Sequence, residues 1–141
     1  MIKQLLMKSQ NRTLTISSEA RTEILDITSQ IKEIVAEINL SEGLLLLHSM
    51  HTTTAIIINE NESRLKKDIE KVLDILFSNR EYMHDQIDNN ADSHLKSIFL
   101  SQSQVVPVSE SQMILGTWQR ILFVELDGPR TRKIFVQAIS T

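Results

Sequence analysis

The way the spacing of apolar residues changes along the chain restricts the fold more than any other feature. Residues 13–17 alternate as in a strand, and residues 22–27 are predicted to be the second strand of a hairpin with them. From Thr28 the apolar residues recur at helical spacing until about Asn39, with Asp26 or Thr28 available as the helix cap. Strand and helix periods therefore alternate within one short chain.

The middle of the chain repeats this succession. Two strands are predicted, one in the leucine run of residues 44–47 and one in the Thr- and Ile-rich residues 52–58. Asn59 with Glu62 three residues later is close to a capping box for a second helix, whose stripe is Leu65, Ile69, Val72, Leu73, Leu76 and Phe77. Residues 79–92 are expected to form an irregular polar loop, and Ser93 is expected to cap a short helix.

The last third has strand-like segments at residues 104–108, 112–115, 120–126 and 133–139, with a turn at 127–130. Strands and helices thus follow one another in groups, without the strict βαβα alternation of a doubly wound fold. The order indicates an α+β fold with a mostly antiparallel sheet.

Composition narrows the function classes. A length of 141 residues suits one domain, and a net charge of −3 argues against a nucleic-acid binder. The absence of cysteine excludes disulfides and thiolate chemistry, so any metal must be held by His, Asp, Glu or water. No apolar run has transmembrane length and the N-terminus is too interrupted for a signal peptide, so we expect a cytoplasmic protein that does not act at a membrane.

Three histidines are candidate metal ligands or catalytic groups. His51 is expected to begin a strand, on the face that also carries Asn59. His84 and His94 flank an acidic loop, and with His51 they would supply the three nitrogen ligands of a catalytic zinc site. The alternatives stay open at this stage: the histidines lack tight metal-motif spacing, and Asn59 can be a helix cap alone.

Cationic and aromatic residues add further candidates. Lys96 is expected in the first turn of the short helix, where free N–H groups favour an anion, and Arg130 and Arg132 beside the turn suit a phosphate. A solvated lysine and surface ion pairs are the alternatives. Trp118 is either a packing anchor or part of a ligand-facing rim. Glu125 stands among apolar strand residues, so it is either buried with a partner or an edge residue in water.

Several motifs occur in one order along the chain. They are residues 51–60, His84, residues 93–96, residues 106–108, residues 116–119, and Glu125 with the tail 125–130. In this order they resemble the YjbQ-like proteins, the secondary thiamine-phosphate synthase family. The resemblance runs from about residue 13 to residue 139. It implies a single domain over residues 1–141, with residues 1–12 as an N-terminal extension.

The resemblance also implies fold, assembly and chemistry. The expected subunit is α+β, with mostly antiparallel β-sandwich-like sheets, two longer helices and one short helix, assembled as a homotrimer. The expected site binds a small phosphorylated metabolite and often a divalent metal, Zn or Mg, with no organic cofactor. Some family members condense a pyrimidine diphosphate with a thiazole phosphate and release pyrophosphate. A binding protein without turnover and a metal-assisted phosphate-ester hydrolase are the alternatives.

Roles follow from the resemblance residue by residue. It implies catalytic roles for His51, His94 and Glu125, and metal binding by His51, His84 and His94. The expected substrate- or phosphate-binding residues are Thr52, Asn59, Glu60, Lys96, Thr117, Trp118, Gln119 and Arg130. The chain departs from the family pattern at Ser101 and Ser111, where glycine is usual. A serine there must adopt a costly positive φ or change the turn.

Overall fold

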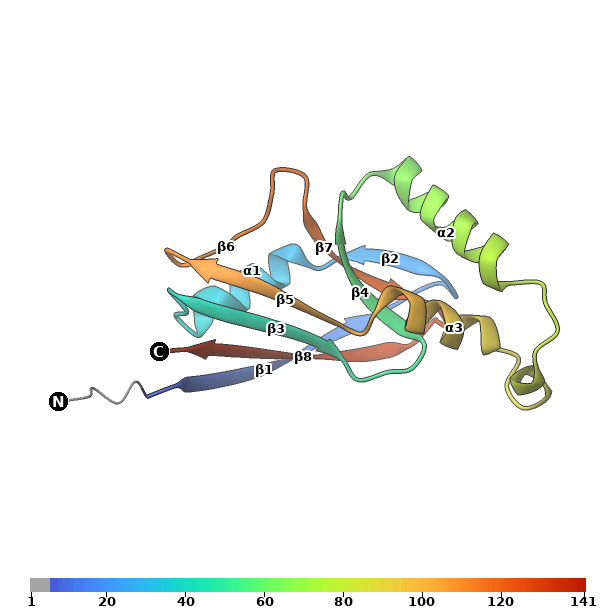
Figure 1. Ribbon diagram of the computed structural model, residues 1–141, viewed down its shortest axis with the longest axis horizontal. Coiled ribbons are helices and arrows are strands. Elements are labelled where there is room, and N and C mark those ends of the chain that lie inside the picture. Colours follow the sequence, from blue (N-terminus) through green and yellow to red (C-terminus); the bar gives the residue numbers. More distant parts are fainter. Residues whose placement is uncertain (1–5) are drawn as a thin grey trace.

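Two antiparallel sheets form the frame of the protein, whose computed structural model describes residues 6–141 (Figure 1). The larger sheet has the order β1-β8-β3-β5-β6 and the smaller sheet the order β2-β7-β4. Their bounds are β1 Lys8–Ser17, β2 Glu23–Asp26, β3 Gly43–Ser49, β4 Thr54–Asn59, β5 Ser103–Ser109, β6 Gln112–Met113, β7 Arg120–Glu125 and β8 Thr131–Ser140. Every strand pair is antiparallel. The predicted α+β fold is confirmed.

The main core lies between the two sheets. It joins Leu47 and Val136 of the larger sheet to Ile56 and Phe123 of the smaller one, and Ile31 of helix α1 (Thr28–Glu37) belongs to it. Their side chains are almost completely buried. The alternation of buried and exposed residues along β3 and β8 reflects a sheet with one face on this core.

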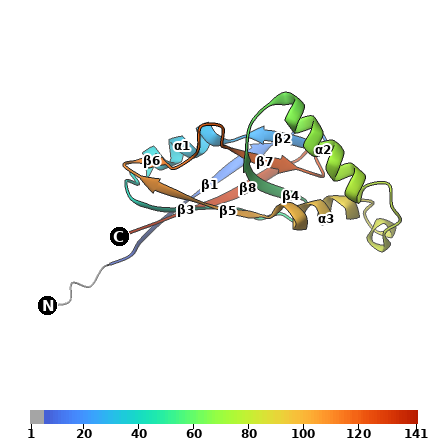
Figure 2. The ribbon, with the colours of Figure 1, turned by 45° about the horizontal axis from the view of Figure 1, so that its top comes forward.

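A second apolar cluster covers the outer face of the smaller sheet. Leu122 and Val124 of β7 belong to it, and Ile69 of helix α2 (Ser63–Phe77) and Leu100 of helix α3 (Ala91–Leu100) pack against it. Buried on both faces, β7 reads as a continuous apolar run from Ile121 to Val124. Figure 2 shows α2 and α3 side by side at the end of the molecule away from β6. None of the helices within residues 6–141 is both long and apolar enough to span a bilayer.

The predicted hairpin of residues 13–17 and 22–27 is wrong. β1 pairs with β8 along its whole length, from Lys8 opposite Ser140 to Ser17 opposite Thr131, whereas β2 pairs with β7. The connection between β1 and β2 crosses from one sheet to the other, so strands adjacent in sequence lie in different layers. Local alternation cannot distinguish these pairings, because both leave one apolar face on the core.

The ends of the helices differ in part from the predicted caps. The cap predicted at Asp26 or Thr28 is wrong, because α1 begins at Thr28 and its N-cap is Ile27, which makes no side-chain cap hydrogen bond. Asp26 precedes the N-cap, and its Oδ1 accepts the N–H of Thr28 at 2.9 Å. The cap predicted at Asn59 is wrong, because Glu62 accepts the N–H of Leu65 at 2.6 Å and α2 begins at Ser63. Ser93 is not a cap either. Helix α3 already begins at Ala91, and the 3₁₀ turn Met83–Gln86 precedes it within the expected polar loop.

Both serines that replace glycines adopt a positive φ, 88° at Ser101 and 63° at Ser111. We expect Ser101→Gly to raise the free energy of unfolding by about 1 kcal/mol. Relief of about 1–3 kcal/mol of backbone strain exceeds the extra chain entropy that glycine brings to the unfolded state. Chemical denaturation of the two proteins measures the difference.

The matched control is Ser29→Gly, an exposed position inside α1. Because Ser29 lies in the first turn of α1 and serine is itself a weaker helix former than alanine, glycine there is expected to lower stability by about 0.5 kcal/mol. A Ser101→Gly protein that loses as much stability as the Ser29→Gly control would show that the positive φ at position 101 carries no strain.

Candidate functional site

A polar cleft forms where the β3–β4 turn, the start of α3 and the 127–130 turn meet. Its volume is about 540 Å³. In the smaller sheet Thr54 lies opposite Glu125, so the segments just outside these two residues are neighbours although they are far apart in sequence. The polar cleft is lined by Met50, His51, Thr52, Thr53, Asp88, Asn90, His94, Asp127, Arg130 and Arg132.

His51 lies in the turn before β4. The prediction that His51 begins the strand is wrong, since β4 starts only at Thr54, whose Oγ1 hydrogen-bonds with Ser49 Oγ across the turn. The His51 Nε2 accepts the backbone N–H of Lys133 at 2.9 Å. In the neutral ring this hydrogen bond puts the proton on Nδ1. His51 therefore offers an N–H donor with a fixed ring orientation.

The surroundings of His51 keep it neutral. Burial lowers its pKa below the ordinary value near 6.5, and the guanidinium group of Arg132 lowers the pKa further. The carboxylate of Glu125 opposes this shift, and Arg130 adds to it. The neutral Nδ1–H form of His51 is thus favoured at physiological pH.

The depressed pKa of His51 predicts a pH dependence of stability. Below pH 6.5 His51 binds a proton in the unfolded chain but not yet in the folded protein. This proton binding stabilises the unfolded state, so the free energy of unfolding falls as the pH is lowered from 6.5 toward the folded-state pKa of His51. The wild type should therefore lose stability relative to His51→Gln over this range. Denaturation of both proteins between pH 7.5 and about pH 5 measures it. Parallel curves would contradict the shift, because the other titrating groups are common to both proteins.

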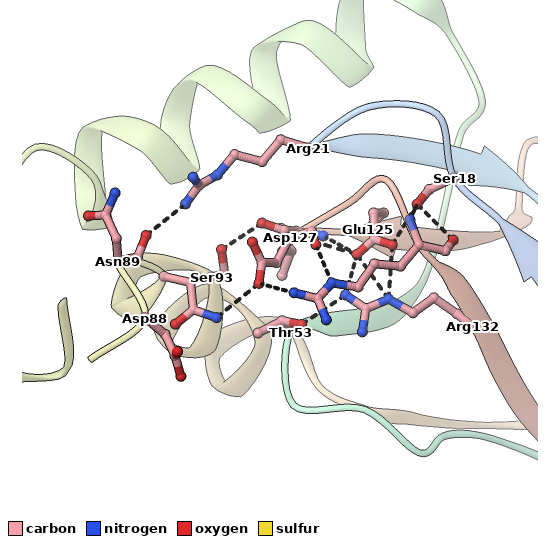
Figure 3. A network of polar contacts seen from close by, with 12 residues as sticks. Ser18, Arg21, Thr53, Asp88, Asn89, Ser93, Glu125, Asp127 and Arg132 are labelled. Carbon is pink, nitrogen blue, oxygen red and sulfur yellow. Dashed lines mark hydrogen bonds and ion pairs between the residues drawn. The ribbon is translucent and has the colours of Figure 1, made fainter. Parts of the chain in front are cut away.

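A buried ion pair supports the floor of the polar cleft (Figure 3). Glu125 is fully buried and Arg132 is 4% exposed. The Arg132 Nη2 donates to Glu125 Oε2 at 2.6 Å and to Thr53 Oγ1 at 2.8 Å. The hydroxyl of Ser18 donates to Glu125 Oε1 at 2.7 Å, and the backbone N–H of Asp127 donates to Oε2. Of the two alternatives for Glu125, the buried acid with a partner is confirmed.

Glu125 is ionised and has all its hydrogen-bonding capacity occupied. Burial by itself would raise the pKa of Glu125, but hydrogen bonds from Arg132, Ser18 and the N–H of Asp127 outweigh it and bring the pKa below its ordinary value. The carboxylate is absent from the lining of the polar cleft, whereas Arg132 and Thr53 belong to the lining. Its contacts therefore position Arg132 and the strand ends.

Arg130 lies at the rim with its side chain 57% exposed. Its Nε donates to the carbonyl oxygen of Asp127 at 2.9 Å and its Nη2 to Asp127 Oδ2 at 3.2 Å. The same Oδ2 accepts from Asn90 Nδ2 at 2.9 Å, which links the rim to the start of α3. Among residues 6–141 the Arg130 Nη1 has no hydrogen-bond partner, so one side of the guanidinium group can still bind an anion.

His94 and His84 contact each other edge to face, with ring centroids 4.8 Å apart. His94 lines the polar cleft. The His84 Nε2 is buried and finds no hydrogen-bond partner within the described part of the chain, and Asp88 Oδ2 lies 3.9 Å away. These contacts bring the acidic loop and α3 together at one side of the polar cleft.

The three histidines predicted to bind a metal are not gathered into one ligand group among the described residues. Over residues 6–141 no group of three or more His, Asp or Glu side chains is placed to hold a metal ion. The lone pair of His51 Nε2 already accepts the N–H of Lys133. Metal binding by His51, His84 and His94 stays a prediction from the resemblance.

Lys96 takes a different position from the predicted one. Because α3 begins at Ala91, Lys96 lies in its second turn and not in the first. The side chain is buried, and Nζ donates to Asp74 Oδ1 at 2.7 Å and lies 3.5 Å from Asp92 Oδ2. These contacts join α3 to α2, and Lys96 is not among the residues that line the polar cleft.

The remaining predicted residues lie at the other end of the smaller sheet. Asn59 is opposite Arg120, about 17 Å along the strands from the Thr54–Glu125 pair. Glu60, Thr117 and Trp118 line a separate pocket of about 370 Å³. Gln119 closes its own turn, where Oε1 accepts the N–H of Gly116 at 2.8 Å. Within one chain, the predicted site residues thus form two separate groups.

Sequence reasoning missed several residues of the polar cleft. Thr53, Asp88, Asn90 and Asp127 line it without having been predicted to bind or react. Asp127 lies in the same turn as Arg130, three residues before it. This spacing of an acid and an arginine could have indicated from the sequence that the two side chains pair. For Asn90, whose contact is with a residue 37 positions away, the sequence offers no such signal.

Comparison with known proteins gives consistent results. The sequence model of the family described as "UPF0047 protein YjbQ-like" matches residues 12–141. A UPF0047 protein of Archaeoglobus fulgidus is 47% identical over 127 residues, which cover 89% of this chain and 98% of that protein. The UPF0047 protein YugU of Bacillus subtilis is 36% identical, over 89% of this chain and 96% of the relative.

Solved structures agree with the fold. A crystal structure of a YbjQ-like protein of unknown function from Sulfolobus solfataricus has a TM-score of 0.93 and 37% identity, covering 96% of this chain and 100% of that one. A hypothetical protein from Aeropyrum pernix has a TM-score of 0.91 and 36% identity, covering 94% and 99% of the two chains.

Proposed function

The chain belongs to the YjbQ-like family of UPF0047 proteins, and from this premise we propose that its polar cleft binds a small phosphorylated metabolite and acts as a transferase on it. The observation that carries the proposal is the fixed Nδ1–H donor of His51, which lies in the same cleft as Arg130. A neutral donor beside a guanidinium group suits the oxygens of a phosphate or diphosphate.

The other lining residues define how the ligand is held. Thr52 adds an exposed hydroxyl beside His51, and Arg132 contributes positive charge from the floor. The carboxylates of Asp88 and Asp127 offset part of this positive charge, so the lining of the polar cleft contains charges of both signs. Such a mixture favours a ligand that has a hydrogen-bond donor in addition to its anionic group.

The proposed reaction is formation of thiamine phosphate. The ring nitrogen of the thiazole phosphate forms a bond to the methylene carbon of the pyrimidine, the bond between that carbon and the diphosphate oxygen breaks, and pyrophosphate leaves with the electron pair. Donors aimed at the departing oxygens stabilise the charge that develops there. His94 lines the polar cleft, and its ring contacts only His84 as an aromatic partner. We assign to His94 the donation of a proton to the departing pyrophosphate oxygen.

The experiment is to incubate the purified protein with the pyrimidine diphosphate and the thiazole phosphate, with and without added Zn²⁺ or Mg²⁺. The expected result is release of thiamine phosphate and pyrophosphate in equal amounts. Saturable pyrophosphate binding without any product would remove the transferase proposal and favour a binding protein. Inorganic phosphate from the pyrimidine diphosphate alone would favour a hydrolase.

We also propose that the protein is a homotrimer. In addition to the family resemblance, large apolar side chains of α2 and α3 support an association surface: Val72, Ile75, Leu76, Ile98 and Phe99 are each at least 45% exposed. Analytical ultracentrifugation should give the mass of three chains. A stable monomer at all accessible concentrations would contradict this proposal.

A further inference from the structure

We infer that a second cavity, between α1 and the strand β6, is a binding site for a small carboxylate that has an apolar body. This cavity, called the α1 cavity below, is lined by residues of α1, by the turn residues 111–113 and by the segment 115–120. Its volume is about 540 Å³, and small-molecule sites usually measure about 300–1,000 Å³.

The α1 cavity is distinct from the polar cleft. Arg120, which begins β7, lines the α1 cavity, whereas Asp127 of the polar cleft follows the other end of this strand. Within residues 6–141 no residue lines both. Figure 2 shows α1 beside β6, away from α2 and α3. A ligand in the α1 cavity therefore does not compete for the residues of the polar cleft.

Part of the lining is apolar. Val35 and Ala36 come from α1, and Met113 and Leu115 come from β6 and the segment that follows it. Val35 is buried, Met113 and Leu115 are half-buried, and Ala36 is exposed. These side chains can remove the apolar part of a ligand from water, which favours binding of that part.

The charged part of the lining is positive, since it contains Lys32 and Arg120 and no acidic residue. None of the ion pairs formed within residues 6–141 involves Lys32. Arg120 has a partner, because its Nε donates to Asp26 Oδ2 at 2.7 Å. The acidic residues Glu33 and Glu37 of α1 lie outside the lining, and Glu37 pairs with an arginine of β1.

The number of free charges selects the class of anion. Burial by itself would raise the pKa of Asp26, but hydrogen bonds from Arg120 and Thr28 bring it to about 2. Asp26 is therefore ionised at neutral pH and offsets the charge of Arg120. Lys32 is left as the one uncompensated cation of the lining, which matches the single negative charge of a carboxylate better than the several charges of a diphosphate.

Hydrogen bonds hold the walls of the α1 cavity in place. On one side the hydroxyl of Thr28 accepts the backbone N–H of Ile121 at 2.9 Å. On the other side the backbone N–H of Ser111 donates to the carbonyl oxygen of Ser41 at 3.0 Å. Both Thr28 and Ser111 belong to the lining. The α1 cavity is thus preformed, and a ligand does not have to order these segments when it binds.

Calorimetric titration with octanoate, which has one negative charge and an apolar chain, tests the inference. Lys32→Gln removes the uncompensated cation, and Ala36→Phe places a ring in the α1 cavity. The matched control is Lys67→Gln, an exposed lysine of α2 outside the lining. All three replaced side chains are exposed, so circular dichroism should show unchanged folding.

The expected result is saturable binding to the wild type and to Lys67→Gln, with no saturable binding to Ala36→Phe. The dissociation constant of Lys32→Gln should be larger by about tenfold or more, since a charge-assisted contact is lost. Absence of saturable binding to the wild type would overturn the inference, as would equal weakening in the two lysine variants. An Ala36→Phe protein that binds like the wild type would place octanoate on another apolar surface and also overturn it.

A second titration tests the class of anion. Octyl phosphate carries two negative charges at about pH 8, and its second charge finds no further cation in the lining. It should bind no more tightly than octanoate, and tighter binding would contradict the assignment to a carboxylate. Because neither titration depends on the polar cleft, an inactive polar cleft would not alter the outcome.

Discussion

Replacing Arg132 with methionine is expected to lower the free energy of unfolding by about 3–5 kcal/mol, since the change leaves the buried carboxylate of Glu125 without its cation. Glu125 is completely inaccessible to water, and Arg132 supplies three of its hydrogen bonds. The hydroxyl of Ser18 and the backbone N–H groups cannot replace a positive charge. Chemical denaturation at neutral pH measures the loss.

Two control proteins separate the buried pair from general effects of the substitution. Arg12→Met removes an exposed arginine that pairs with Glu37, and should cost at most about 1 kcal/mol. The double variant Arg132→Met with Glu125→Leu should regain part of the stability, because no buried charge is left without a partner. If Arg132→Met is as stable as Arg12→Met, the pair does not hold the floor of the polar cleft together.

Replacing His94 with alanine is expected to reduce turnover by about 10²–10⁴-fold, the usual contribution of a positioned acid or base. Its effect on folding should be small, since His94 is only half-buried and its one aromatic contact, with His84, is worth about 0.5–1.5 kcal/mol. The measurement is the initial rate of pyrophosphate release at saturating substrate, together with a denaturation curve.

His48→Ala is the matched control for His94→Ala. His48 is exposed on β3, where its Nδ1 contacts Ser103 Oγ at 2.6 Å, and it is not part of the polar cleft. This variant should keep the wild-type rate. A His94→Ala protein with full activity would contradict the assignment of proton transfer to His94, and an equal loss in both variants would point to a general effect of removing a histidine.

Sequence periodicity was sufficient to predict the helices and strands, but not to predict which strands pair with each other. The change of period at Thr28 predicted α1, and the apolar run around Phe123 predicted β7. The hairpin of β1 with β2 was predicted wrongly, because alternation specifies which face is buried and does not specify the neighbouring strand. Ser101 and Ser111 were predicted to need a positive φ or a changed turn, and both adopt the positive φ.

The candidate site was predicted only in part, because its contacts join segments that are distant in the sequence. Glu125 among apolar residues left two alternatives, a buried acid with a partner or an edge residue in water, and only the fold, which brings residues of β7 and β8 together, makes Arg132 its partner. His51 and Arg130 do line one cleft. Lys96 and Trp118 do not, since order along the sequence does not reveal at which end of a strand a motif lies, or whether a lysine finds carboxylates on a neighbouring helix.

The most direct test of the proposed ligand site is calorimetric titration with pyrophosphate of the wild type, Arg130→Gln and Arg12→Gln. We predict saturable binding to the wild type and to Arg12→Gln, and a dissociation constant for Arg130→Gln that is larger by about tenfold or more, since a charge-assisted hydrogen bond is lost. Absence of saturable binding to the wild type, or an equal loss in the two arginine variants, would contradict an anion site in the polar cleft.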